Sequence, residues 1–206
     1  MACKTLYLVR HGEATHNEAI KKYGKQIVLQ ETFFDPELTP LGRSQAAQTR
    51  DALGQTAIEN ELCVVSPLSR ALQTSYIIFP TLPKICLEVV REMIGEHPCD
   101  RRRSQTELQA LYPDLTFCLD GDEDVLYSPA REPASEVANR ARRFLKWLRD
   151  QPQRTVAVVT HDHFLEGLWG VLREMEQRGE CTGTAGVNKE HFSNAECRRV
   201  EVTLSS

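Results

Sequence analysis

Three short apolar runs, each followed by a segment with helical character, restrict this chain to an α/β architecture. The runs lie in 6–9, 61–66 and 155–160. Short runs of this kind are typical of strands that are buried on both faces of a parallel sheet. Helical patterns separate them, for example over 40–53, where Thr39 is a predicted N-cap and Pro40 the first helical residue. We therefore expect a three-layer α/β/α sandwich with a mostly parallel central sheet.

The remaining segments complete this prediction. The residues of 85–90 read as a further strand, and those of 69–79 and 135–148 as helices, the second of them strongly amphipathic. Alternating apolar and polar residues over 195–204 predict a final edge strand, which we expect to run antiparallel to the rest. The Gly/Thr-rich stretch 177–189 is expected to be mobile.

The chain has the size and composition of one domain. It has 206 residues, of which 41% are hydrophobic, and its formal net charge is −4. We expect a single domain over 1–206, with an insertion around 95–133 that lies over the active site. The mixed charge gives no indication of a nucleic-acid or membrane partner. No signal peptide or membrane span is expected, and the sequence leaves the oligomeric state open.

Cysteine usage favours a reducing compartment. The seven cysteines are widely scattered, and none forms a Cys-x-x-Cys pair. This spacing predicts free thiols and, as the default, a cytoplasmic protein.

Reactive and charged side chains follow four of the predicted strands. Arg10 and His11 follow the first strand, and Arg70 lies just beyond the second. Glu92 follows the third strand, and His161 follows the last parallel one. The carboxyl ends of parallel strands share one edge of a sheet, where α/β folds bind ligands. Two arginines, two histidines and a carboxylate at this edge predict a phosphoryl-transfer site.

Four motifs, in this order along the chain, carry a resemblance to a known family. They are Arg10-His-Gly-Glu13 with Asn17, Leu38-Thr-Pro-Leu-Gly42 with Gln45, Ser66-Pro-Leu-Ser-Arg70, and Thr160-His161. Together they resemble the histidine phosphatase superfamily, which includes cofactor-dependent phosphoglycerate mutase and fructose-2,6-bisphosphatase. The resemblance covers most of the chain. The segment 95–104 is similar to a poorly characterised branch of phosphoglycerate-mutase-like proteins from plants and fungi.

The resemblance implies roles for the motif residues. His11 would be the nucleophile and would become a phosphohistidine, which requires a neutral imidazole. Arg10 and Arg70 would disfavour the imidazolium form and neutralise the phosphoryl oxygens. Asn17 and His161 would contact the same oxygens. Because the arginines supply the positive charge, we expect no metal and no cofactor, and a small phosphorylated substrate as the partner.

The identity of the general acid is left between two glutamates. In better-known members of the superfamily the acid/base glutamate precedes a glycine by four residues, whereas Glu92 precedes Gly95 by three. Glu96 is therefore a rival, and we favour Glu92. This residue would protonate the leaving oxygen and then accept a proton from the attacking water.

The run Arg101, Arg102 and Arg103 admits two interpretations. It could clamp a second anionic group of the substrate, with at most one of the three arginines facing the site. Alternatively, it is a solvated run that is balanced by nearby acidic residues. The three arginines are therefore candidate substrate-binding residues.

Several neighbouring residues carry weaker signals. His97, Cys99 and Asp100 have metal-ligand side chains, but no matching second cluster exists, so no metal is expected there. His163 is expected to diverge from His161 and to be structural or peripheral. His16 fits either the rim of the site or an exposed helix surface. Asp162 is expected to cap the next helix rather than to orient His161 or pair with an arginine.

The leading functional prediction is a metal-independent phosphatase that hydrolyses a small phosphorylated metabolite through phosphorylated His11. One alternative is mutase-type phosphoryl transfer, which the short chain and the unlike insertion disfavour. A second alternative is a non-catalytic regulator that binds a phosphorylated ligand. It is disfavoured because all the expected catalytic groups are present. The substrate cannot be named from these motifs, because one motif set serves many substrates.

Overall fold

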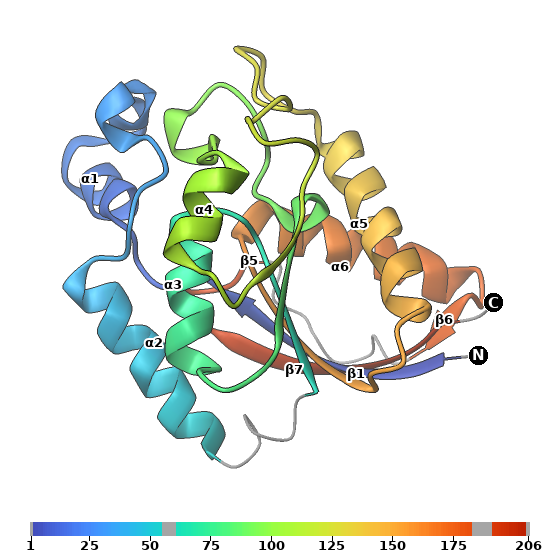
Figure 1. Ribbon diagram of the computed structural model, residues 1–206. Helices are drawn as coiled ribbons and strands as arrows, with labels where there is room; N and C mark the ends of the chain where they lie inside the picture. Colours follow the sequence, from blue (N-terminus) through green and yellow to red (C-terminus); the bar gives the residue numbers. More distant parts are fainter. Residues whose placement is uncertain (1, 55–60, 183–190, 205–206) are drawn as a thin grey trace.

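The computed structural model describes residues 2–54, 61–182 and 191–204. Its centre is a seven-stranded sheet with the order β4-β3-β2-β5-β1-β7-β6 (Figure 1). The strands are β1 (Ala2–Arg10), β2 (Leu62–Val65), β3 (Lys84–Leu87), β4 (Thr116–Cys118), β5 (Thr155–Thr160), β6 (Cys181–Thr182) and β7 (Cys197–Leu204).

Strand β1 is paired along both of its edges. It runs parallel to β5, with Arg10 opposite Thr160, and antiparallel to β7. The pairs β2–β5, β2–β3 and β3–β4 are also parallel. The expected mostly parallel sheet is therefore confirmed. The antiparallel strand β7 is bordered by the two-residue β6, which takes the outermost position.

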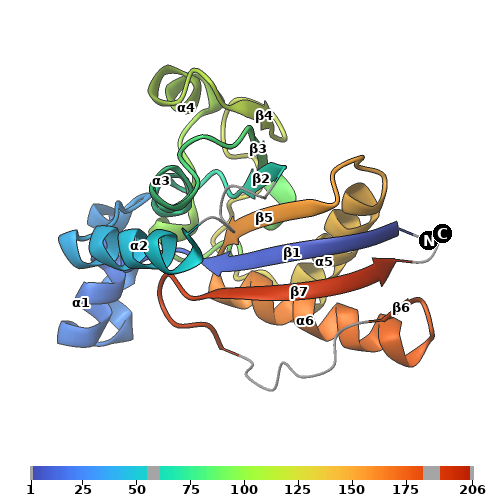
Figure 2. The ribbon, with the colours of Figure 1, turned by 90° about the horizontal axis from the view of Figure 1, so that it is seen from below.

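Helices cover both faces of this sheet, as the predicted three-layer sandwich requires (Figures 1 and 2). The α-helices are α1 (Thr15–Tyr23), α2 (Pro40–Leu53), α3 (Ser69–Ile78), α4 (Gln105–Leu111), α5 (Ala134–Arg149) and α6 (Asp162–Gln177). Short 3-10 helices are η1 (Lys25–Leu29), η2 (Glu31–Phe33), η4 (Glu88–Val90) and η5 (Pro98–Asp100).

The core consists of two layers because strand side chains alternate between faces. Leu6 and Leu8 of β1 pack with α5 and α6, whereas Tyr7 and Val9 pack with α2 and α3 on the other face. Strand β5 alternates in the same way, and its residues 156–160 are all buried. Burial on both faces explains why these strands read as continuous apolar runs.

The segment 84–133 differs most from the prediction. The strand predicted over 85–90 ends at Leu87, and η4 follows, because the Glu88 carboxylate turns to buried Arg91 and Arg102. The expected insertion adds a short parallel strand, β4, beside β3, which the sequence did not indicate. Of the stretch 177–189 that was expected to be mobile, residues 183–189 lie outside the described part.

Two other expectations concern chemistry and location. All seven cysteines belong to the described residues and are free thiols, as predicted. Among the described helices, none is both long and apolar enough to cross a membrane.

Candidate active site

The loop that follows β1 is held in place by the start of helix α2. Thr39 caps this helix, as predicted, and its hydroxyl accepts the Gly42 N–H at 3.0 Å. Gln45 accepts the Glu13 N–H at 2.9 Å. A Cβ added at Gly42 would lie 1.9 Å from the Glu13 carbonyl oxygen, so helix and loop touch backbone to backbone. The Leu38–Gly42 motif thus packs against the loop that carries His11.

Strand register brings the two histidines of the motifs together. The His11 N–H donates to the Thr160 carbonyl at 3.0 Å, and the ring centroids of His11 and His161 are 5.0 Å apart. The His11 carbonyl accepts the Ala195 N–H at 3.1 Å and the Asn194 side-chain amide at 3.2 Å, just before β7. His11 is thus fixed from both sides of β1.

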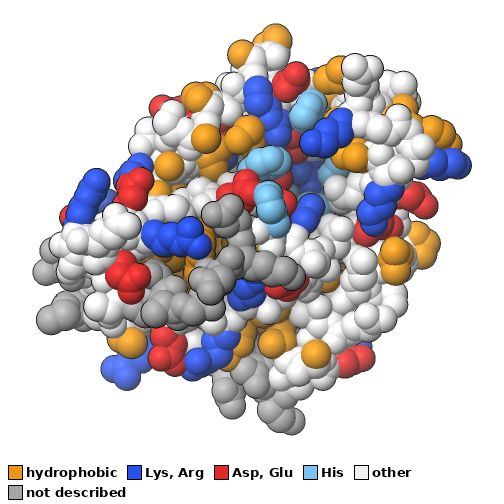
Figure 3. Space-filling view, turned by 180° about the vertical axis from the view of Figure 1, so that it is seen from behind, with side chains coloured by type: hydrophobic (Ala, Val, Ile, Leu, Met, Phe, Trp, Pro, Cys, Tyr) orange, Lys and Arg blue, Asp and Glu red, His pale blue; other side chains and the backbone are white. Residues whose placement is uncertain are grey.

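A cavity of about 590 Å³ opens at this edge of the sheet. Figure 3 shows histidine, basic and acidic side chains gathered around a hollow on this face. The basic residues that line the cavity are Arg10, Lys21, Lys25, Arg70 and Arg131. The acidic lining residues are Glu92, Asp100 and Asp162. The excess of basic groups favours an anionic ligand.

The surroundings of His11 favour the neutral form of its imidazole. Its Nδ1 lies 2.7 Å from the Gly12 carbonyl oxygen, an acceptor, so the ring proton is on Nδ1 and Nε2 keeps its lone pair. Arg70 Nε lies 3.3 Å from this Nε2. Burial, and then the charge of Arg70, lower the pKa of His11 well below its ordinary value. The imidazole is therefore uncharged at neutral pH, as attack on phosphorus requires.

Two further imidazoles share this neutral environment. His16 is 6% exposed and its ring centroid lies 6.1 Å from that of His11. It lines the cavity, so of the two alternatives for this residue the exposed helix histidine is wrong. His161 is fully buried, and its Nε2 lies 2.8 Å from the Ser66 hydroxyl. Burial, followed by Arg70, lowers the pKa of both imidazoles well below the ordinary value.

Three buried polar atoms of this group have no hydrogen-bond partner among the described residues. They are Arg10 Nε, His16 Nδ1 and His161 Nδ1. Buried polar groups without partners are costly and rare in folded proteins. Their concentration beside His11 indicates a site built for a ligand with several acceptor oxygens.

The two motif arginines are anchored differently. Arg70 is 1% exposed, and its two Nη atoms donate to the Cys99 carbonyl at 2.6 Å and to Asp100 Oδ1 at 3.0 Å. Arg10 donates to the Phe192 carbonyl, and its Nη1 lies 3.5 Å from Asp162 Oδ2. Both guanidinium groups are held in the cavity wall by these contacts.

Asp162 therefore takes a different role from the one expected. The N-cap of α6 is His161, whose side chain makes no capping hydrogen bond. Asp162 is the first helical residue, and it pairs with Arg10 and accepts the Phe192 N–H at 3.1 Å. The prediction that Asp162 caps the helix is wrong, and the alternative of an arginine pair describes its position.

Glu92 and Glu96 occupy different environments. Glu92 lines the cavity and is 8% exposed, and its Oε1 accepts the Met93 N–H at 2.8 Å. The Glu96 side chain is 47% exposed, does not line the cavity, and lies 3.5 Å from His97 Nε2. Only Glu92 is thus in reach of a ligand in the cavity.

The segment 95–133 forms part of the cavity wall through a buried ion-pair network. Asp100 joins Arg70 at 3.0 Å and Arg131 at 2.6 Å. Burial raises the pKa of Asp100, but a hydrogen bond from His97 and the charges of Arg70 and Arg131 outweigh it, so the pKa lies below its usual range. Asp100 therefore remains ionised and orients both arginines.

The run 101–103 has partners of its own. Arg102 is buried and donates to Glu88 Oε2 at 3.0 Å and to the Asp122 carbonyl at 2.6 Å. Arg101 lies 2.7 Å from Glu31 Oε2, and Arg103 lies 3.2 Å from Asp35 Oδ2. The structure places none of the three arginines in the cavity lining.

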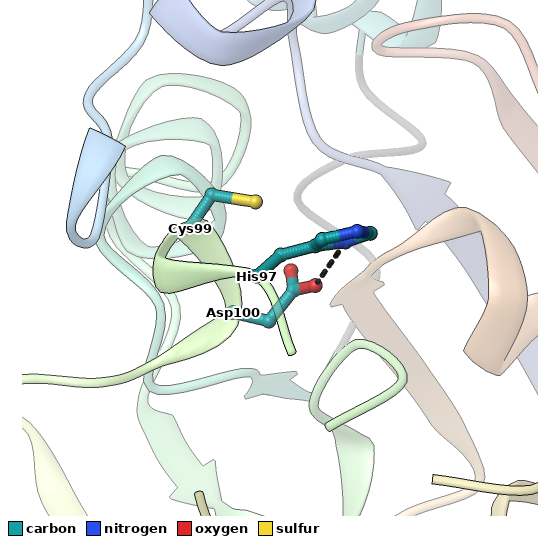
Figure 4. Close-up of side chains that lie close together, drawn as sticks. All are labelled: His97, Cys99 and Asp100. Carbon is teal, nitrogen blue, oxygen red and sulfur yellow. Dashed lines mark ion pairs between the residues drawn. The ribbon is translucent and has the colours of Figure 1, made fainter. Parts of the chain in front are cut away.

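One group of side chains has the chemistry of metal ligands. The ligand atoms of His97, Cys99 and Asp100 lie within 4.8 Å of one another (Figure 4). However, both Asp100 oxygens already contact guanidinium groups, and burial raises the pKa of the Cys99 thiol. A cation there would face Arg70 and Arg131 and a protonated thiol, so these residues are poor ligands.

Some cavity residues carried no clear signal in the sequence. Arg131 and Asn194 belong to no motif, and Arg131 reaches the site only because the segment 95–133 folds back against the sheet. His163 was expected to be structural or peripheral; it lines the cavity, and its Nδ1 lies 3.2 Å from Glu92 Oε1. This position arises because β5 ends at Thr160, so His163 lies on helix α6 and not on a strand. Asn17 lines the cavity, and its Oδ1 accepts the Ala14 N–H at 3.0 Å. Its contact with a phosphoryl group stays a prediction.

Comparison with known proteins identifies relatives of this chain. Residues 6–201 match the histidine phosphatase superfamily (branch 1). The chain is 36% identical to a phosphoglycerate mutase-like protein of Arabidopsis thaliana over 200 residues, which cover 81% of this chain and 73% of that protein. It is 30% identical to a probable phosphatase of Schizosaccharomyces pombe over 171 residues, which cover 77% and 74% of the two chains.

A solved structure shows the same fold. The ecdysone phosphate phosphatase of the silk moth Bombyx mori, in complex with tungstate, aligns with a TM-score of 0.63 at 14% identity. The alignment covers 95% of this chain and 88% of that one. The ordered motifs, the fold and the matched residues define an α/β protein of the histidine phosphatase type. The chain belongs to the histidine phosphatase superfamily.

Proposed function

We propose that this protein hydrolyses phosphate monoesters of small metabolites through a phosphohistidine on His11. The carrying observation is the contact between His11 Nδ1 and the Gly12 carbonyl, which leaves Nε2 unprotonated in a cavity walled by Arg10 and Arg70. A neutral, unprotonated nitrogen beside fixed positive charge is what in-line attack on a phosphoryl group requires.

The reaction then divides into two steps. His11 Nε2 forms a bond to phosphorus while the ester oxygen leaves, and Glu92 gives that oxygen a proton. Glu92 next accepts a proton from water, whose oxygen attacks the phosphohistidine and releases phosphate. Arg10, Arg70 and the His161 Nδ1 atom stabilise the transferring oxygens, and no metal is needed because the guanidinium groups supply the charge.

The test is phosphate release from a panel of metabolite monoesters, in the presence of a chelator, by the wild type and by His11→Ala. We expect release by the wild type and its loss in the variant, together with acid-labile phosphate on His11. Equal release by both proteins would exclude the mechanism. A requirement for an added divalent metal would exclude the metal-independent form of the reaction.

Mutase-type transfer is the second candidate, because relatives of this chain carry phosphoglycerate mutase-like names. The same panel distinguishes it when 2- and 3-phosphoglycerate are included with and without a bisphosphate primer. Primer-dependent isomerisation without phosphate release would favour the mutase. Binding of phosphorylated ligands with no turnover would favour a regulator.

A further inference from the structure

A second imidazole lies beside the candidate general acid. His163 Nδ1 lies 3.2 Å from Glu92 Oε1, and both residues line the cavity. Glu92 is 8% exposed, whereas the His163 side chain is 48% exposed. The pair therefore links a nearly buried carboxyl to solvent through one imidazole. Among the described residues, the only other contact of Oε1 is with the Met93 N–H.

We infer that His163 is a positioning residue that holds Glu92 by this contact and passes the catalytic proton to and from Glu92 during the cycle. The inference rests on the proposed function, because it requires Glu92 to act as the general acid. It adds a proton source beside the Glu92 carboxyl, namely the imidazole of His163.

The charges around His163 support this role. The hydrogen bond and negative charge of Glu92 raise the pKa of His163 to about 9, and Glu166 adds to this effect. Partial burial and the charge of Arg131 act in the opposite direction but are outweighed. His163 is therefore an imidazolium at neutral pH, so the pair carries one proton in the pH range where a lone carboxyl has none.

The His163/Glu92 pair has the same protonation at the end of the reaction cycle as at its start. When a phosphorylated substrate binds, the proton on His163 Nδ1 moves to Glu92, which leaves a neutral imidazole and a carboxylic acid. The acid gives this proton to the leaving oxygen as the bond from that oxygen to phosphorus breaks. In the second step water loses a proton to Glu92, and its oxygen forms the new bond to phosphorus. The proton then returns from Glu92 to His163.

The test compares His163→Gln with the wild type across pH 5–10. The amide keeps a polar contact with Glu92 but does not titrate. His191→Gln is the matched control, because His191 is an exposed histidine that lies 2.8 Å from Glu166 and does not line the cavity. The substrates are p-nitrophenyl phosphate, whose leaving group needs no proton, and the best alkyl phosphate of the panel.

For the alkyl ester, we expect wild-type kcat/KM to fall as pH rises through about 9. In His163→Gln this decline should move by more than about one pH unit toward acid, with a loss of about 10-fold or more at pH 8. For the p-nitrophenyl ester, kcat/KM of His163→Gln should differ from the wild-type value by less than about threefold. His191→Gln should match the wild type. If His163 had a structural role alone, its substitution would lower kcat/KM equally for both substrates and would not shift the pH profile.

A titration by NMR tests the pair without turnover. The imidazole of His163 should titrate near pH 9 in the wild type and closer to its ordinary value in Glu92→Gln. If kcat/KM of His163→Gln declines at the same alkaline pH as in the wild type, and His11-dependent hydrolysis is intact, the proton relay alone is overturned. Absence of His11-dependent hydrolysis in the wild type would overturn the proposed function and the relay with it.

Discussion

Asp100 Oδ1 lies 3.0 Å from Arg70 Nη2, and both side chains are buried. This ion pair joins the segment 95–133 to the arginine that contacts His11. The segment is thus a wall of the cavity and not only a cover over it. Differences in this segment between relatives would change the position of Arg70 as well as the space for the substrate.

The two candidate glutamates provide a matched test of the general acid. We expect Glu92→Gln to lower kcat for alkyl phosphates by about 100-fold, because the amide cannot protonate a poor leaving group. The kcat of Glu96→Gln should stay within about twofold of the wild-type value, since Glu96 is exposed and lies outside the cavity. The measurement is kcat for a series of esters with leaving groups of graded pKa. The opposite ranking of the two variants would assign the role to Glu96.

Substitutions of Arg101 and Arg102 should differ in their effect on the free energy of unfolding and not in their effect on substrate binding. Removing buried Arg102 leaves Glu88 with one fewer partner and several carbonyls unpaired, so Arg102→Met should cost about 3 kcal/mol or more of unfolding free energy. Arg101→Met removes a surface pair and should cost less than about 1 kcal/mol, with KM unchanged. Urea unfolding and KM would be measured together. A large rise in KM for Arg101→Met at unchanged stability would restore its role in substrate binding.

Acid should destabilise the protein because the buried histidines take up protons when the chain unfolds. The pKa values of buried His11, His16 and His161 are lowered by burial and by Arg70, so the unfolded chain binds more protons than the folded one below about pH 6.5. The unfolding free energy should therefore fall between pH 6.5 and 5, by at most about 1.4 kcal/mol per pH unit for each group. His16→Asn should reduce this slope in urea titrations, whereas the exposed control His191→Gln should keep it. A slope that is the same in His16→Asn would contradict a lowered pKa of His16.

Two glycines test the contact between helix α2 and the His11 loop. The Cβ of Gly42→Ala would strike the Glu13 carbonyl, so we expect a loss of about 2 kcal/mol in stability and a lower kcat. Gly170 lies inside α6 with nothing within 4 Å of an added Cβ, so Gly170→Ala should stabilise by up to about 1 kcal/mol. Thermal unfolding and kcat of both variants would be compared. Normal activity in Gly42→Ala would show that the loop tolerates displacement.

The parts of the site that local sequence predicts are those set by the sheet. Strand β5 and the Thr39 cap were predicted at the correct residues, because apolar runs and capping residues act over a few positions. Parallel register then brings His11 and His161 to one edge. The strand break after Leu87 could not be predicted in this way, since it depends on Glu88 meeting Arg91 and Arg102 in three dimensions.

The same distinction holds for the cavity wall. Arg131 and His163 carry no motif, and each enters the site through an ion pair with a residue far away in the chain. A helical assignment that began at Asp162 would have placed His163 on α6, but its partner Glu92 is defined only by the tertiary fold. Buried charge pairs of this kind have no periodicity that a single sequence displays.

The position of β1 has a consequence for how a newly made chain acquires its activity. Both neighbours of β1 come from the last third of the chain, and the His11 carbonyl is secured by Asn194 and Ala195. During synthesis, β1 leaves the ribosome with neither edge paired, and such long-range pairing forms slowly. His11, the proposed nucleophile, is therefore translated before the strands that hold it in place, and a chain without those strands lacks this site. The exposed edges of this nascent strand are also where aggregation would begin if the ends of the chain failed to meet.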